Sequence, residues 1–322
     1  MNDKLNFHFR RCALPLLMAG VALPAAAHNN NAYVANQVDN TVSVINTATN
    51  AVSATIPVGA TPVAVAVSPS GANVYVANAS DNTVSVIDAA TNIVKAVVPV
   101  VDTPVAVAVS PNGANLYVAN ANVSTVSVIN TATNAVVASV PVGGVPFSIA
   151  VSPNGARAYT VNTGDSTVSV IDTKANKVIA TIPMEGSPVG VAAGPLGARV
   201  YVANIGSNNV SVIDTSSNKV AGTIPAGVGA DGVTTSPIGF PVYVSNFQDN
   251  TVSVVDPLSK KLIATVPVGS SPGSLAVSEN SGRVYVVNTN SNTVSVINPF
   301  TNKVIATVAV GSLPAAVATQ PQ

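Results

Sequence analysis

The tyrosines of this chain are spaced at a constant interval of 42 residues along the sequence. The chain has seven of them, and they are Tyr33, Tyr75, Tyr117, Tyr159, Tyr201, Tyr243 and Tyr285. Each is followed three residues later by an asparagine. A fixed period of this length indicates a repeat architecture, in which each repeat is one supersecondary unit that its neighbours must cover. We therefore expect seven copies of one small unit.

Each unit contains four short β-rich segments joined by turn residues. In residues 62–101 the segments read PVAVAVS, VYVAN, TVSVID and IVKAVVPV. The first turn, PSGAN, contains Pro69, which fixes its own φ, and Gly71, which can adopt a positive φ. No segment places apolar residues three and four apart over a useful length, as amphipathic helices require. Each unit is therefore predicted to be a four-stranded antiparallel sheet.

Seven such units predict a seven-bladed β-propeller, and a straight β-solenoid is the alternative. The first unit starts at Ala32 without its leading strand, whereas the sequence ends with that strand alone, from Pro314 to Thr319. A solenoid would need polar caps at both ends, but a closed ring leaves no long exposed edge. We therefore expect an all-β, seven-bladed propeller of four-stranded antiparallel blades, closed by pairing of its N- and C-terminal segments.

The repeats also resemble those of a known family. YVAN, YVSN and YVVN, followed by NTVSVID and VIATIPVG-like segments, resemble the YVTN family of β-propeller repeats over about residues 33–322. The resemblance implies seven blades around a channel, with the PVAVAVS strand innermost. It implies little about function, because similar propellers include proteins of unknown role, surface-layer components, lactonases, and domains that carry haem or a quinone cofactor.

Residues 1–27 have the features of a secretory signal peptide. Basic residues precede the apolar segment CALPLLMAGVAL, and Ala25–Ala27 provide a cleavage site before His28. An uncleaved membrane anchor is the alternative, but the apolar segment is shorter than the ~20 residues that span a bilayer. We therefore expect residues 28–322 to form the propeller of a periplasmic or secreted protein, with no membrane span after cleavage.

The composition of the cleaved chain restricts its chemistry. Cleavage removes Cys12 and His8, which leaves His28 as the one histidine and no cysteine. Catalysis by Ser–His–Asp or Cys–His groups and zinc sites built on His and Cys therefore lack their residues. Outside the repeat tyrosines, only His28 and Met184 could ligate haem. A non-catalytic role is favoured, and the alternative is a divalent-metal-dependent lactonase-like or other hydrolase with its site at a channel mouth.

The charge and the turn residues restrict the partners. Cleavage removes three of 13 basic and one of 13 acidic residues, so ten bases and 12 acids remain and the net charge is −2. No basic cluster is available to hold a nucleic acid backbone. Turns rich in Asn, Ser and Thr favour a protein partner or a carbohydrate of the cell envelope. We expect a monomer that acts as an exported binding or interaction scaffold.

The residues that recur in every unit are interpreted as structural. Each tyrosine is expected to pack its ring between blades. Each asparagine after YVA is expected to bond the backbone of its turn, and so is the Asp or Asn that ends each TVSVI segment. Four aspartates in the turn after YVAN are expected to form Asx turns, and they are Asp39, Asp81, Asp165 and Asp249.

Candidate site residues are found where the units differ. Asp102, Glu185 and Asp231 stand near the start of innermost strands, where no other unit carries an acid. The unit of Asp231 is the most altered and contains the pair Phe240–Pro241. The hypothesis is that the three acids meet at a channel mouth, bind the ligand there and hold a calcium-like cation through hard oxygen ligands. The favoured alternative is three solvated loop acids. No other cofactor and no catalytic residue is expected.

Overall fold

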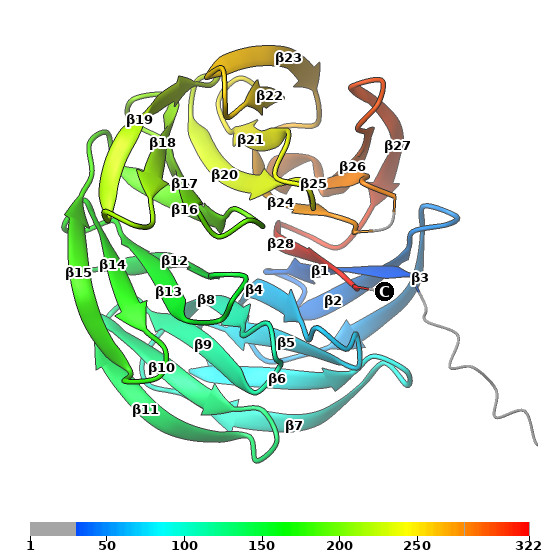
Figure 1. Cartoon of the computed structure of the whole chain (residues 1–322). Helices are drawn as coiled ribbons and strands as arrows, with labels where there is room; N and C mark the ends of the chain where they lie inside the picture. Colours follow the sequence, from blue (N-terminus) through cyan, green and yellow to red (C-terminus); the bar gives the residue numbers. More distant parts are fainter. Residues whose placement is uncertain (1–29, 280, 322) are drawn as a thin grey trace, which may run out of the picture.

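The chain forms seven four-stranded antiparallel sheets arranged as blades around a centre (Figure 1). The structure is a computed structural model, and it describes residues 30–279 and 281–321. Each strand is short because a Val- and Thr-rich segment, which suits a pleated surface, ends at an Asn-, Asp- or Gly-rich turn. The turn between the first two strands of a blade has the predicted geometry, since Gly71 adopts φ +71°.

The blades are numbered from the sheet that contains β1. Blade 1 consists of β28 (Pro314–Thr319), β1 (Asn31–Asn36), β2 (Thr41–Asn46) and β3 (Ala51–Pro57). Blades 2 and 3 consist of β4 (Pro62–Val67), β5 (Asn73–Asn78), β6 (Thr83–Asp88), β7 (Ile93–Pro99), β8 (Pro104–Val109), β9 (Asn115–Asn120), β10 (Thr125–Asn130) and β11 (Ala135–Pro141). Blades 4 and 5 consist of β12 (Pro146–Val151), β13 (Arg157–Asn162), β14 (Thr167–Asp172), β15 (Lys177–Pro183), β16 (Pro188–Ala193), β17 (Arg199–Asn204), β18 (Asn209–Asp214) and β19 (Lys219–Pro225). Blades 6 and 7 consist of β20 (Ala230–Thr235), β21 (Val242–Asn246), β22 (Thr251–Asp256), β23 (Lys261–Pro267), β24 (Pro272–Val277), β25 (Val284–Asn288), β26 (Thr293–Asn298) and β27 (Lys303–Ala309).

The two ends of the propeller meet in blade 1. Strand β28 pairs antiparallel with β1, with Val317 opposite Val34 and Thr319 opposite Ala32. Blade 1 therefore contains both the first and the last strand of the described chain, and Figure 1 shows β28 beside β1. The predicted closure is confirmed, and the solenoid alternative is wrong.

The core lies between the blades. The second and third strands of each blade are buried along nearly their whole length, whereas the outermost strand exposes alternate residues. Tyr33 of blade 1 is fully buried in a cluster that includes Val74 and Val76 of blade 2. Tyr75 packs in the same way against Leu116 of blade 3. The prediction that the tyrosines pack between blades is confirmed.

The asparagine that ends each second strand does not bond its turn as predicted. Asn36 is fully buried, and its Nδ2 donates to Thr41 Oγ1 at 3.0 Å and to Ser43 Oγ at 2.9 Å. The cause is the hairpin register, which places Asn36 directly opposite Thr41. At the end of the third strand the prediction is confirmed, because Asn46 Oδ1 accepts the turn amides of Ala48 and Thr49.

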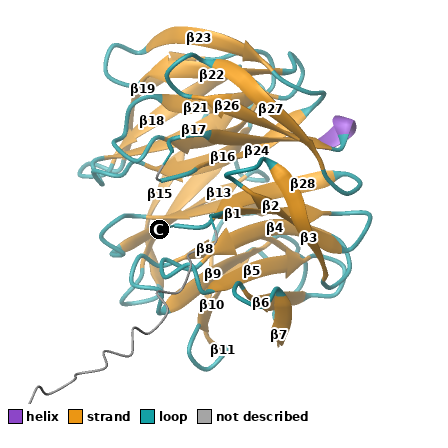
Figure 2. Cartoon of the chain, turned by 90° about the vertical axis from the view of Figure 1, so that its right-hand side faces the viewer, coloured by secondary structure: helices purple, strands orange, loops and turns teal. Residues whose placement is uncertain are grey.

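Helix is almost absent from the described part of the chain. One 3-10 turn, η1 (Thr289–Ser291), follows β25 and lies on the right-hand side of the molecule in Figure 2. Within residues 30–279 and 281–321, no helix has the length and apolar character needed to cross a membrane. The predicted signal peptide, residues 1–27, lies outside the described residues.

Candidate functional site

A central channel passes between the seven innermost strands, which are β4, β8, β12, β16, β20, β24 and β28. It holds a cavity of about 560 Å³. Each inner strand has an irregular register directly after its first residue, as between Pro62 and Ala64 of β4. Such a bulge redirects side chains, and as a result Val63, Ala64 and Val65 all line the cavity.

Most side chains of the channel wall are apolar, although the wall exposes polar and apolar surface in nearly equal amounts. It is formed largely by Val, Ala, Ile and Leu side chains, together with the rings of Phe147 and Phe247. These two phenylalanines remain 46% and 39% exposed, more than most aliphatic side chains of the inner strands. The polar side chains of the wall are Gln37, Ser148, Ser274, Thr289 and Asp231. Of the described residues that line the cavity, Asp231 alone carries a formal charge.

Asp231 lies near the start of β20 with its carboxylate at the channel wall. Within the described chain this carboxylate accepts no hydrogen bond and forms no ion pair. A Cβ atom placed on Gly273 would lie 3.4 Å from Asp231 Oδ2, so the absence of a side chain there leaves room beside the carboxylate. Burial raises the pKa of Asp231 from 3.8 to about 6, because water that would solvate its charge is displaced.

A hydroxyl and two glycines fix the backbone that carries Asp231. Gly232 N donates to Ser245 Oγ at 2.8 Å, and Ser245 Oγ donates to the carbonyl oxygen of Gly273 at 2.6 Å. A Cβ on Gly232 would come within 2.4 Å of that carbonyl oxygen, so only glycine fits. Ser245 is fully buried and stands where most blades carry alanine. This network holds the bulge that presents Asp231 to the channel.

The structure does not bring Asp102 and Glu185 to this carboxylate. Asp102 accepts hydrogen bonds from Thr103 Oγ1 at 2.9 Å and from Asn122 Nδ2 at 3.3 Å, and it is not part of the channel wall. Glu185 is exposed and lines a separate cavity of about 260 Å³ with Ser207. Among the described residues, no group of three His, Cys, Asp or Glu side chains could hold one metal ion. The calcium site stays a prediction, for which Asp231 is the one predicted ligand in the channel.

The repeat itself explains the position of Glu185. Five other blades carry glycine there, and in four of these an aspartate occupies the space of the missing side chain. In blade 2, for example, a Cβ on Gly59 would lie 2.7 Å from Asp81 Oδ2. That oxygen accepts the amide of Ala60 at 2.6 Å, so these aspartates bind the facing loop and the predicted Asx turns are wrong. Glu185 faces Ser207, which stands in place of the aspartate.

The replacement of glycine and aspartate by Glu185 and Ser207 in blade 5 predicts that these two positions are energetically coupled. We expect Ser207→Asp alone to destabilise the protein, because the new carboxylate meets the side chain of Glu185. The double variant Glu185→Gly with Ser207→Asp restores the arrangement of Gly143 and Asp165 in blade 4. We expect it to be more stable than the sum of the single changes by about 1 kcal/mol, measured by urea unfolding. Additive single effects would contradict this explanation.

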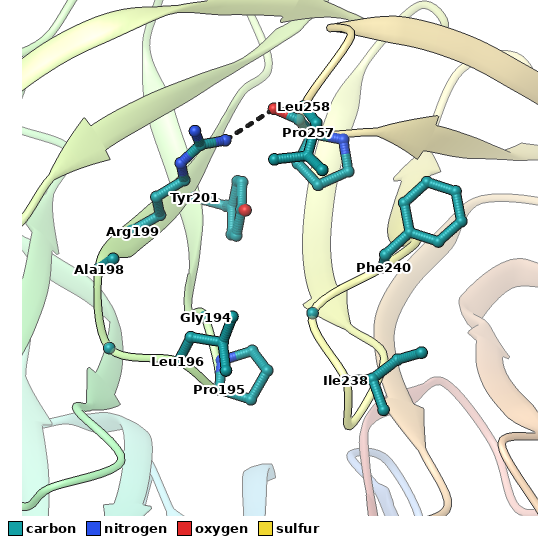
Figure 3. A pocket seen from close by; sticks show the side chains of 12 residues that line it. Gly194, Pro195, Leu196, Ala198, Arg199, Tyr201, Ile238, Phe240, Pro257 and Leu258 are labelled. Carbon is teal, nitrogen blue, oxygen red and sulfur yellow. Dashed lines mark hydrogen bonds between the residues drawn. The ribbon is translucent and has the colours of Figure 1, made fainter.

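A second cavity, of about 300 Å³, lies between blades 5 and 6 and is called the apolar pocket (Figure 3). Its apolar side chains come from the β16–β17, β20–β21 and β22–β23 connections, and they include Pro195, Leu196, Ile238, Phe240, Pro257 and Leu258. Arg199 Nη1 closes one side by donating to the carbonyl oxygen of Pro257 at 2.9 Å. Leu196 is 85% exposed and Ile238 77% exposed.

Sequence reasoning noted Phe240 but missed this pocket, although a signal was present. At the position of Leu196 and Ile238, blades 3 and 4 carry Asn112 and Asn154.

We expect the double variant Leu196→Asn with Ile238→Asn to keep its melting temperature within about 3 °C, since exposed side chains contribute little to stability. Its ANS fluorescence should fall by at least about half, because exposed apolar surface is lost. Unchanged fluorescence would show that the pocket offers no such surface.

The comparisons with known proteins agree with this fold. A sequence model described as YNCE-like beta-propeller matches residues 12–123. None of the curated proteins compared with the chain matches its sequence. A solved protein of unknown function from Desulfotomaculum acetoxidans is 19% identical and superimposes with a TM-score of 0.81, covering 91% of this chain and 100% of its own.

Two further solved structures are similar at comparable identity. Hydrazine synthase from Kuenenia stuttgartiensis is 23% identical with a TM-score of 0.72, and the match covers 79% of this chain and 88% of that one. Dihydro-heme d1 dehydrogenase NirN, solved in complex with DHE, is 14% identical with a TM-score of 0.67, covering 90% and 75%. At these identities the likeness concerns the fold. The chain is a seven-bladed β-propeller, and its residues 12–123 are similar to the YNCE-like beta-propeller model.

Proposed function

We propose that this protein is an exported, non-catalytic binding scaffold of the periplasm or cell envelope that takes its ligand into the central channel at Asp231. The observation that carries the proposal is a carboxylate that has no partner among the described residues, in a cavity of about 560 Å³ lined mainly by apolar side chains. Cavities of this size, mainly apolar and with few placed polar groups, are typical of small-molecule sites. Maintaining an unpaired carboxylate there costs stability, and a bound ligand that contacts the carboxylate offsets the cost.

Two further observations support the proposal. The features of residues 1–27 that predict a signal peptide support export. The hydroxyls that line the channel support binding more than hydrolysis, because Ser148 Oγ and Ser274 Oγ accept the backbone amides of Val191 and Val317. Both hydroxyls therefore tie neighbouring inner strands together.

The test is native mass spectrometry of the full chain, expressed in a Gram-negative host and recovered from its periplasmic fraction. We expect a mature mass that begins at His28 and a non-covalent low-mass ligand that is released on denaturation. In the variant Val63→Phe with Val105→Phe, the ligand should be lost, because these positions correspond to Phe147 of blade 4 and two more rings fill the channel.

The control is Val97→Phe, which adds the same ring on the outermost strand β7, where Val97 is exposed. This variant should retain the ligand. A wild-type protein without any ligand, or a filled channel that still binds it, would overturn the proposed function. Recovery only from the cytoplasm with an uncleaved N-terminus would overturn the export.

A further inference from the structure

We propose that the ligand of the central channel is an organic cation, an ammonium group with a small apolar body, and that Asp231 binds its charge. This inference rests on the proposed function, and it adds the chemical class of the ligand. It follows from the charge, the wall and the surroundings of the channel.

The charge of the channel selects a cation. Asp231 is the one charged side chain among the described residues of the wall, most of whose other side chains are apolar. Gly273 of β24 lies beside the carboxylate and Gly190 of β16 lies beside the backbone carbonyl of Asp231, and neither residue titrates. An opposite charge brought to this carboxylate therefore interacts without competition from a protein cation, at a site where water screens it weakly. A neutral or anionic ligand gains no comparable electrostatic attraction from the carboxylate.

The wall favours an organic cation over a metal ion. Calcium requires six to eight oxygen ligands, whereas the channel offers one carboxylate, and the described residues form no metal-binding acidic group. An ammonium group needs fewer oxygens when its substituents are covered by apolar side chains. Val189 and Leu275, from the strands on either side of β20, supply such a surface.

Aromatic faces add a second attraction for the same ligand class. Phe247 directly follows β21 in the blade of Asp231, and Phe147 lies on β12 at the position that Asp231 occupies in β20. Both rings line the cavity. A cation over an aromatic ring gains from its quadrupole, and quaternary ammonium groups are often recognised in this way. Gln37 and Thr289 supply hydrogen bonds for a polar end of the ligand.

The experiment is isothermal titration calorimetry of the mature protein, freed of ligand by denaturation and refolding. The probes are benzyltrimethylammonium, benzyl alcohol, benzoate and calcium chloride. We expect the ammonium probe to bind at least tenfold more tightly than the alcohol, and benzoate to give no heat. Asp231→Asn should weaken the ammonium probe at least tenfold, whereas the matched loss of one exposed acid, Glu185→Gln, should change nothing. Binding should also weaken at pH 5, where Asp231 is mostly protonated.

The outcomes separate the two proposals. Equal binding of the alcohol and the ammonium probe, or an unchanged affinity in Asp231→Asn, would overturn the cation class. If calcium gives heat with the wild type and none with Asp231→Asn, the channel is a metal site and not a site for an organic cation. If no probe binds while the natural ligand is still displaced by filling the channel, the proposed function stands and this inference fails.

Discussion

A chain that ends at Ser312 is expected to lose most of its thermal stability, although it lacks only residues 313–322. These residues contain β28, the innermost strand of blade 1. Without it, the edge of β1 is unpaired from Ala32 to Asn36. Strand β28 also contacts β24 and β4, so blades 7 and 2 lose their inner neighbour at the same time. The effect is large because one strand closes the whole ring.

The size of the effect follows from burial. Ala316 and Val317 are 8% and 5% exposed, and their removal uncovers Tyr33, Val34 and Tyr285, which are fully buried in the intact ring. Exposing a large apolar side chain costs about 1.5–3 kcal/mol, and several are exposed at once. The total approaches the 5–15 kcal/mol that stabilises an ordinary domain. We therefore expect circular dichroism melts to show a fall of at least about 15 °C.

A shorter deletion and a peptide complete this experiment. Removal of Pro321 and Gln322 leaves β28 in place and should shift the melting temperature by less than about 3 °C. Addition of a synthetic peptide of residues 313–322 should restore stability to the truncated chain, or permit it to refold if it does not fold alone. A truncated chain that melts like the intact protein would contradict the closure of the ring.

The architecture was predictable because its determinants are local and repeated. A turn residue such as Gly71 acts within a few positions, and the interval between tyrosines defines the blade without knowledge of any contact. The partners of single side chains were less predictable. Asn36 bonds Thr41 and Ser43 because of the hairpin register. Asp81 bonds Ala60, which lies 21 residues away in the preceding connection. Neither relation is visible in one isolated turn.

The site was predictable only in part for the same reason. Asp231 was identified as a departure from the repeat, and it is the one of the three predicted acids that lines the channel. Asp102 and Glu185 are also departures, but each belongs to a contact between neighbouring connections. The network of Ser245 with Gly232 and Gly273 was missed, although its signal was present. Glycine interrupts the inner strand in three consecutive blades, at Gly190, Gly232 and Gly273, and Ser245 replaces alanine in the same region.

Asp231→Asn is expected to stabilise the ligand-free protein at neutral pH, which is the reverse of most substitutions at buried polar sites. The carboxyl has a pKa of about 6 in the folded protein and about 3.8 in the unfolded chain. Well below pH 4 the carboxyl is protonated in both states, and its burial costs little stability. As the pH rises from 4 through 6, the Asp231 carboxyl ionises in the unfolded chain but stays largely protonated in the folded protein. The native state therefore loses stability over this range. Above about pH 7 the full cost of the buried charge is present.

Asparagine has nearly the same shape and no charge, so the variant does not bear this cost. A pKa difference of about two units corresponds to about 3 kcal/mol. Urea unfolding of ligand-free protein should therefore show a variant more stable than wild type by up to about 3 kcal/mol at pH 7.5 and by a much smaller margin at pH 4. Glu185→Gln, which removes an exposed acid, should show no such dependence on pH. A variant that is less stable at pH 7.5 would show that the Asp231 charge already has a partner in the folded protein. Saturating benzyltrimethylammonium should narrow the gap, because the bound cation stabilises the ionised wild-type channel more than the variant.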